Sequence, residues 1–85
     1  MKKVKKYTVY STPTCVYCNL LNKWLTENNI PYEEADVVKD PAKGQEMINK
    51  TGQMSVPVSI IIFEDDSEEV ILGFNQDHLT RLLGI

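Results

Sequence analysis

The run VSIIIF, which closes residues 56–63, constrains the fold more than any other stretch of the chain. A strand with one solvated face alternates apolar and polar residues, whereas a strand covered on both faces is apolar almost throughout. The sequence therefore predicts a strand from Val56 to Phe63 inside a sheet. Other elements must pack above and below that sheet, which favours a layered fold with helices on both faces.

The first half of the chain alternates between strand and helix patterns. Val4 to Tyr10 and Tyr32 to Val38 have the alternation and composition of strands. Between them, helix spacing begins at Cys15 and ends at Asn-Asn-Ile-Pro, residues 28–31. The apolar face predicted for this helix consists of Val16, Leu20, Leu21, Trp24 and Leu25. A strand–helix–strand unit predicts two parallel strands.

Cap and turn residues delimit the remaining elements. Asp40 and Pro41 predict the start of a helix that runs to Thr51, with Gly52 beyond its end. The acidic turn 64–68 predicts a hairpin to a strand at 69–72, and Asn75 predicts the cap of a last helix. The predicted order is β-α-β-α-β-β-α, an α/β fold with a four-stranded mixed sheet and three helices. We expect one domain, residues 1–85.

Charge and hydropathy restrict the partners and the compartment. The net charge of −3 argues against nucleic acid as a partner. No apolar run approaches the roughly 20 residues of a membrane span, so no membrane association is expected. The N-terminal lysines lead into a strand pattern rather than the apolar core of a secretion signal. We therefore expect a cytoplasmic protein.

The two cysteines, Cys15 and Cys18, lie where the first strand runs into the first helix. They could be a redox pair, part of a metal site, or two incidental thiols. A structural disulfide is rare in the cytoplasm, and one that closes so small a loop contributes little stability. A zinc site needs four ligands, and the one histidine, His78, lies far along the chain. A CxxC beside a βαβ pattern is typical of a thioredoxin-like redox motif.

The position of the pair at a helix start gives each cysteine a different chemistry. Cys15 would meet the free backbone N–H groups and the positive end of the helix dipole, which stabilise a thiolate, the nucleophilic form. Cys18, one turn later, would lie deeper and within reach of Cys15. The sequence therefore predicts that Cys15 attacks and Cys18 resolves.

Three segments, YSTPTCVYC, TGQMSVP and LGFNQDHL, resemble glutaredoxins of the thioredoxin fold. Val16 replaces the proline of the family's Cys-Pro-Tyr-Cys, and Tyr17 matches. The valine and the pair Gly73-Phe74 are similar to small glutaredoxin-like redoxins that reduce ribonucleotide reductase. The resemblance implies a monomeric dithiol–disulfide oxidoreductase that acts on disulfide-containing proteins, ribonucleotide reductase among them, with no bound cofactor.

The resemblance also implies a substrate-binding surface around the cysteines. Pro57 matches a cis-proline that lies beside the active site in the family, and the backbone of Val56 would pair with an extended substrate. From the residues alone, a trans proline that starts the strand stays equally open. Tyr17 is implied to be exposed and to contact a partner.

The last landmark of the resemblance concerns glutathione. Gly73, Phe74 and Asp77 match the segment that binds the amino end of glutathione in members that use it, although Asp77 also suits a helix start. Phe74 replaces a glycine there, and Thr12 stands where many such relatives have lysine or arginine. Glutathione and thioredoxin reductase are both candidate electron donors, and these two replacements favour the reductase.

Two alternatives to this function stay open. Some glutaredoxins bind an iron–sulfur cluster between two chains, with glutathione as a further ligand, and Cys15 would be the protein ligand here. Because one domain supplies too few thiolates, that function would require a dimer. The other alternative is an adaptor of the thioredoxin fold with idle thiols.

Overall fold

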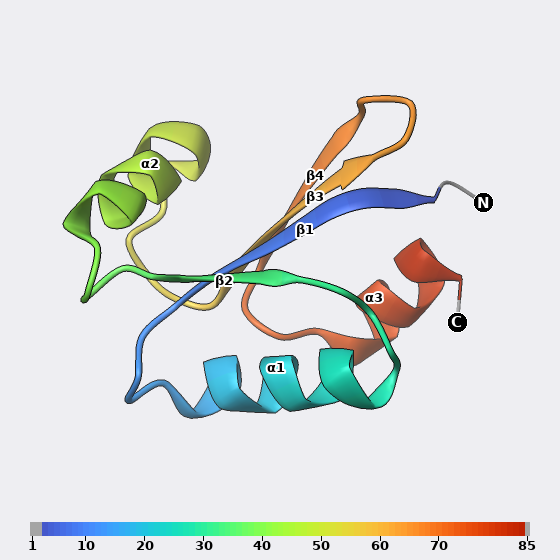
Figure 1. The fold of residues 1–85 in the computed structure, drawn as a ribbon, viewed down its shortest axis with the longest axis horizontal. Coiled ribbons are helices and arrows are strands. Elements are labelled where there is room, and N and C mark those ends of the chain that lie inside the picture. The colour runs from blue at the N-terminus through green and yellow to red at the C-terminus, as the bar shows by residue number, and fades with distance from the viewer. Residues whose placement is uncertain (1–2, 85) are drawn as a thin grey trace.

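The apolar run Val58–Phe63 forms one of the two interior strands in a four-stranded sheet. A computed structural model describes residues 3–84 (Figure 1). Its elements, in chain order, are β1 (Val4–Ser11), α1 (Val16–Glu27), β2 (Glu33–Asp36), α2 (Pro41–Thr51), β3 (Val58–Phe63), β4 (Glu68–Leu72) and α3 (Gln76–Leu83). The predicted order β-α-β-α-β-β-α is confirmed.

The strands lie in the order β2-β1-β3-β4. β1 pairs with β2 in parallel and with β3 antiparallel, and β3 pairs antiparallel with β4. The sheet is therefore mixed, as predicted. Val9 of β1 lies opposite Glu34 of β2 on one side and opposite Ser59 of β3 on the other.

Helices cover both faces of this sheet, with α1 and α3 on one side and α2 on the other (Figure 1). Successive residues of β1 divide between the two layers, because side chains alternate across a strand. Val9 packs with Leu21 of α1 and Leu79 of α3. Tyr10 packs with Met47 of α2, and its hydroxyl donates a 2.7 Å hydrogen bond to Glu46 Oε1 of the same helix.

The capping residues behave as the sequence predicts. The carboxylate of Asp40 accepts a hydrogen bond from the N–H of Ala42 at the start of α2, and Gly52 ends that helix in the left-handed region at φ 72°. Asn75 caps α3 through the N–H of His78, an exposed residue. Within residues 3–84, no helix combines the length and apolarity that a membrane span needs.

The predicted apolar face of α1 is wrong at two positions. Val16 and Leu20 are 68% and 46% exposed. The face turned to the sheet carries Cys18, Leu21 and Leu25, all fully buried. These three lie three and four residues apart and form the stripe that faces the sheet. The half-buried Trp24 packs beside this stripe, whereas Val16 and Leu20 lie outside it in solvent.

The bounds of all four strands also differ from those expected, and β1 runs one residue further, to Ser11. β2 is confined to Glu33–Asp36, because the chain turns away once its register with β1 ends at Ser11. β3 begins at Val58 rather than Val56, since Pro57 has no N–H to donate to a ladder. β4 begins one residue early, at Glu68, opposite Ile62.

Candidate redox site

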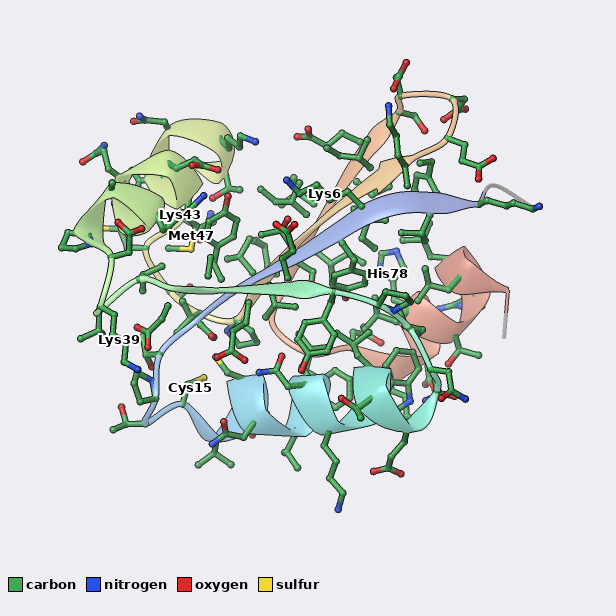
Figure 2. All side chains as sticks on the ribbon, viewed as in Figure 1. Lys6, Cys15, Lys39, Lys43, Met47 and His78 are labelled. Atoms are coloured by element: carbon green, nitrogen blue, oxygen red, sulfur yellow. The ribbon has the colours of Figure 1, made fainter. Side chains whose placement is uncertain are left out.

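Cys15 is the N-cap of α1. The chain leaves β1 at Ser11, and a 3.3 Å hydrogen bond from Cys15 N to the carbonyl of Thr12 closes the turn that follows. The Cys15 sulfur then takes the place that a serine or aspartate oxygen fills in most helices, because it accepts a 3.2 Å hydrogen bond from the N–H of Cys18. Figure 2 shows Cys15 at the first turn of α1, on the side that faces the sheet.

Cys18 is fully buried one turn further along the helix. Burial raises the pKa of the Cys18 thiol to about 12, with further upward contributions from the hydrogen bond to Cys15 and the negative charges of Cys15 and Glu34, partly opposed by the backbone of Thr12. Both cysteines are free thiols in the structure. The pair thus combines an accessible sulfur at a helix start with a protected one behind it.

The cis peptide bond expected between Val56 and Pro57 is present. The carbonyl of Val56 lies 3.8 Å from the Cys15 sulfur and accepts a hydrogen bond from its thiol. The N–H of Gly73 donates a 2.8 Å hydrogen bond to the carbonyl of Pro57. The start of α1, the cis-proline segment and the end of β4 are distant in the sequence. These contacts therefore connect them, from Cys15 through Val56 and Pro57 to Gly73.

Among the other expected binding residues, Tyr17 is exposed as expected, whereas Phe74 and Asp77 contact residues other than the cysteines. Tyr17 is 65% exposed beside the cysteines. Phe74 is half-buried and packs against Trp24 of α1, with ring centroids 6.1 Å apart. Asp77 is exposed in the first turn of α3, where its backbone carbonyl accepts a hydrogen bond from Arg81. Within the described residues 3–84, neither Phe74 nor Asp77 forms a hydrogen bond, ion pair or ring contact with the cysteines.

A polar contact between α1 and β2, one helix turn after Cys18, was not predicted from the sequence. Nδ2 of Asn22 in α1 donates a 2.5 Å hydrogen bond to Oε2 of Glu34 in β2. Two signals were available: Asn22 follows Cys18 by four residues, which places both on one helix face, and Glu34 lies within a strand pattern. Neither signal pairs the two residues without the register of β1 and β2.

Residues 3–84 contain no cluster of three or more histidine, cysteine, aspartate or glutamate side chains arranged to hold a metal ion.

The fold and the site define a thioredoxin-fold protein of the thiol–disulfide exchange class. The features that define it are a mixed sheet with helices on both faces, a cis-proline, and a CxxC at the start of α1. Sequence comparison narrows the class. Residues 7–63 match the glutaredoxin profile. The chain belongs to the glutaredoxin family, whose members are thiol–disulfide oxidoreductases, and it is such an enzyme.

Individual relatives agree with this assignment. A glutaredoxin-like 8.6 kDa protein of the rubredoxin operon of Clostridium pasteurianum is 32% identical, over 88% of this chain and 93% of its own. The glutaredoxin-like protein NrdH of Lactococcus lactis is 31% identical, over 88% and 96%. The crystal structure of the thioredoxin-like protein BC3987 superposes with a TM-score of 0.79 at 36% identity, over 92% of this chain and all of that one.

Proposed function

We propose that the protein reduces protein disulfides by a dithiol mechanism in which Cys15 attacks and Cys18 resolves. The observation that carries this proposal is the 3.2 Å hydrogen bond from the N–H of Cys18 to the Cys15 sulfur. It stabilises a thiolate at Cys15 with a helix N–H group, and it holds the buried Cys18 one turn behind it.

The reaction has two exchange steps. The Cys15 thiolate attacks one sulfur of the substrate disulfide, forms a mixed disulfide and releases the other substrate sulfur as a thiolate. Cys18, deprotonated as it reacts, then attacks Cys15, so that the Cys15–Cys18 disulfide forms and the second substrate sulfur leaves. The substrate gains two electrons and the protein loses them. An external dithiol or reductase must then restore the protein.

Val56 and Pro57 support an extended protein segment as the substrate. The cis bond presents the Val56 carbonyl beside Cys15, where backbone groups of an extended chain can pair with it. The exposed Tyr17 provides a neighbouring apolar contact. Because the chain resembles redoxins that reduce ribonucleotide reductase, a disulfide of that enzyme is the substrate we propose to test first.

Thioredoxin reductase is the electron donor that the site favours over glutathione. Thr12 provides no cation at the position where many glutathione-using relatives carry one. Phe74 packs against Trp24, and its ring occupies the position of a glycine in those relatives. The donor and substrate both fit a monomeric carrier in the cytoplasm.

The test is NADPH consumption with a disulfide substrate, run with thioredoxin reductase alone or with glutathione and glutathione reductase. We expect the first route to be faster. Cys15→Ser should abolish turnover in both, and Cys18→Ser should accumulate a mixed disulfide that mass spectrometry detects. An active Cys15→Ser variant would refute the mechanism, and faster turnover with glutathione would refute the choice of donor.

A further inference from the structure

The resolving step requires a proton to leave a buried thiol. Cys18 is fully buried, and its pKa is raised to about 12. Burial, the largest cause of this rise, persists in the mixed disulfide, so at pH 7 only a small fraction of molecules would carry the thiolate before the attack. A group that accepts this proton during the attack would remove that limit. This inference rests on the dithiol mechanism proposed above.

Asn22 lies between the buried Cys18 and the exposed Glu34 in degree of burial. It lies four residues after Cys18 on the same face of α1, and it is half-buried. Its Nδ2 donates to Glu34, but its buried Oδ1 has no hydrogen-bond partner among residues 3–84. Buried amide oxygens usually accept a hydrogen bond, often from an ordered water. Asn22 therefore has an available acceptor on the helix face that also carries Cys18.

Glu34 places a carboxylate at the end of this path. It pairs in register with Val9, whose side chain packs in the layer of α1 and α3. Its neighbour Glu33 faces the other side of the sheet, where its Oε2 lies 3.5 Å from the ammonium of Lys6; Figure 2 shows Lys6 on that side. Within residues 3–84, Glu34 forms no ion pair, and its side chain is exposed to solvent.

We propose that Glu34, held by Asn22, accepts the proton that Cys18 loses as it attacks the mixed disulfide. The three side chains are fully buried, half-buried and exposed in that order, which is the gradient that a proton path from the interior to solvent needs. The negative charge of Glu34 also acts on Cys18, which agrees with the contact between Glu34 and Asn22, one helix turn after Cys18.

The S–H bond of Cys18 breaks, and its proton passes to the Glu34 carboxylate, directly or through one water molecule. The Cys15–Cys18 bond forms with the electron pair of Cys18. The bond between Cys15 and the substrate sulfur breaks, and its electron pair leaves with the substrate thiolate. Glu34 then gives the proton to solvent.

Stopped-flow mixing of the reduced protein with excess chromogenic aromatic disulfide separates the two exchange steps. Attack by Cys15 releases one coloured thiolate at a rate proportional to the reagent concentration. Attack by Cys18 releases the second at a rate independent of that concentration. The first phase tests the proposed function and the second tests the proton acceptor, so the two proposals fail in different phases.

Glu34→Gln is the decisive variant, because glutamine still accepts the hydrogen bond from Asn22 but takes up no proton. We expect its second phase to slow about tenfold or more at pH 7, with the first phase unchanged. If Glu34 acted only through its charge, its removal would lower the pKa of Cys18 and make the second phase faster. An unchanged or faster second phase would overturn the proposal.

Glu33→Gln is the matched control, since it removes the adjacent carboxylate on the opposite face of the sheet, and its second phase should equal that of the parent. A second readout is the pH profile between pH 6 and 8. Tyr7 and Tyr32 also pack in the layer of α1 and α3. Both are present in every variant, so any effect they have on the second-phase rate is the same in each. Cys15 does not ionise within the mixed disulfide.

With a carboxylate acceptor, the second-phase rate of the parent should be nearly flat over this range. In Glu34→Gln it should rise about tenfold per pH unit, because free thiolate becomes the only reactive form. A role in stability alone would not change this slope. A parent profile that already rises tenfold per unit would also overturn the proposal.

Discussion

Raising the pH from 8 to 10 should destabilise the reduced protein through Cys18. The folded protein raises the pKa of this thiol from an ordinary value of 9.0 to about 12. Above pH 9 the unfolded chain therefore releases a proton that the folded chain retains, so the free energy of unfolding falls as the pH rises, up to about pH 12. Below pH 9 the thiol is protonated in both states, and the effect vanishes.

The size of the effect follows from these two values. Between pH 8 and pH 10, Cys18 should remove about 1.4 kcal/mol from the free energy of unfolding. For a small domain that loses about 1 kcal/mol per molar urea, the midpoint should shift by more than about 1 M. The assay is urea unfolding of the protein at pH 8, 9 and 10 with a phosphine reductant present.

Cys18→Ala is the matched reference, because it retains every other group that titrates in this range. Tyr7 and Tyr10, whose pKa values are raised chiefly by burial, contribute equally to both proteins and cancel in the difference. The parent should lose about 1.4 kcal/mol more than Cys18→Ala between pH 8 and 10. Equal losses in the two proteins would refute the claim that the fold holds Cys18 protonated.

Three further predictions concern packing, the α2 contact and the cluster alternative. Leu21→Ala should cost about 2–5 kcal/mol of stability in urea unfolding, whereas Leu20→Ala, on the exposed side of α1, should cost less than about 1 kcal/mol; similar costs would contradict the observed helix face. Tyr10→Phe removes the hydrogen bond to Glu46 and should lower stability by about 1 kcal/mol, with no change in the rate of Cys15 attack; a change in that rate would contradict a purely structural contact. Anaerobic expression should give a colourless protein if the dithiol mechanism holds, and a coloured dimer that loses its visible absorption in Cys15→Ser would favour the iron–sulfur alternative.

The sequence predicts the order of elements because each one carries a local signal. The apolar run of β3, the helix period after Cys15 and the caps Asp40 and Asn75 all act over a few residues, and the structure confirms them. The signal for the redox site is equally local, because the pattern changes from strand to helix at Cys15 and so places it at a helix start.

Features that depend on tertiary packing were harder to predict. An apolar periodicity does not say which edge of a helix meets the sheet, so the exposure of Val16 and Leu20 was missed. The contact between Asn22 and Glu34 depends on the register of β2 against β1. The cis bond at Pro57 was expected from a family resemblance, because local sequence alone allows either isomer.

The sheet divides the interior into two layers that share almost no side chains. Met47 and Tyr10 belong to the layer of α2, whereas Leu21 and Leu79 belong to the layer that backs the cysteines. Substitutions at sites without shared partners usually have additive effects on stability. The α2 layer can therefore accumulate compensating changes independently, which gives evolution, or an engineer, a region in which to adjust stability while the redox layer stays constant.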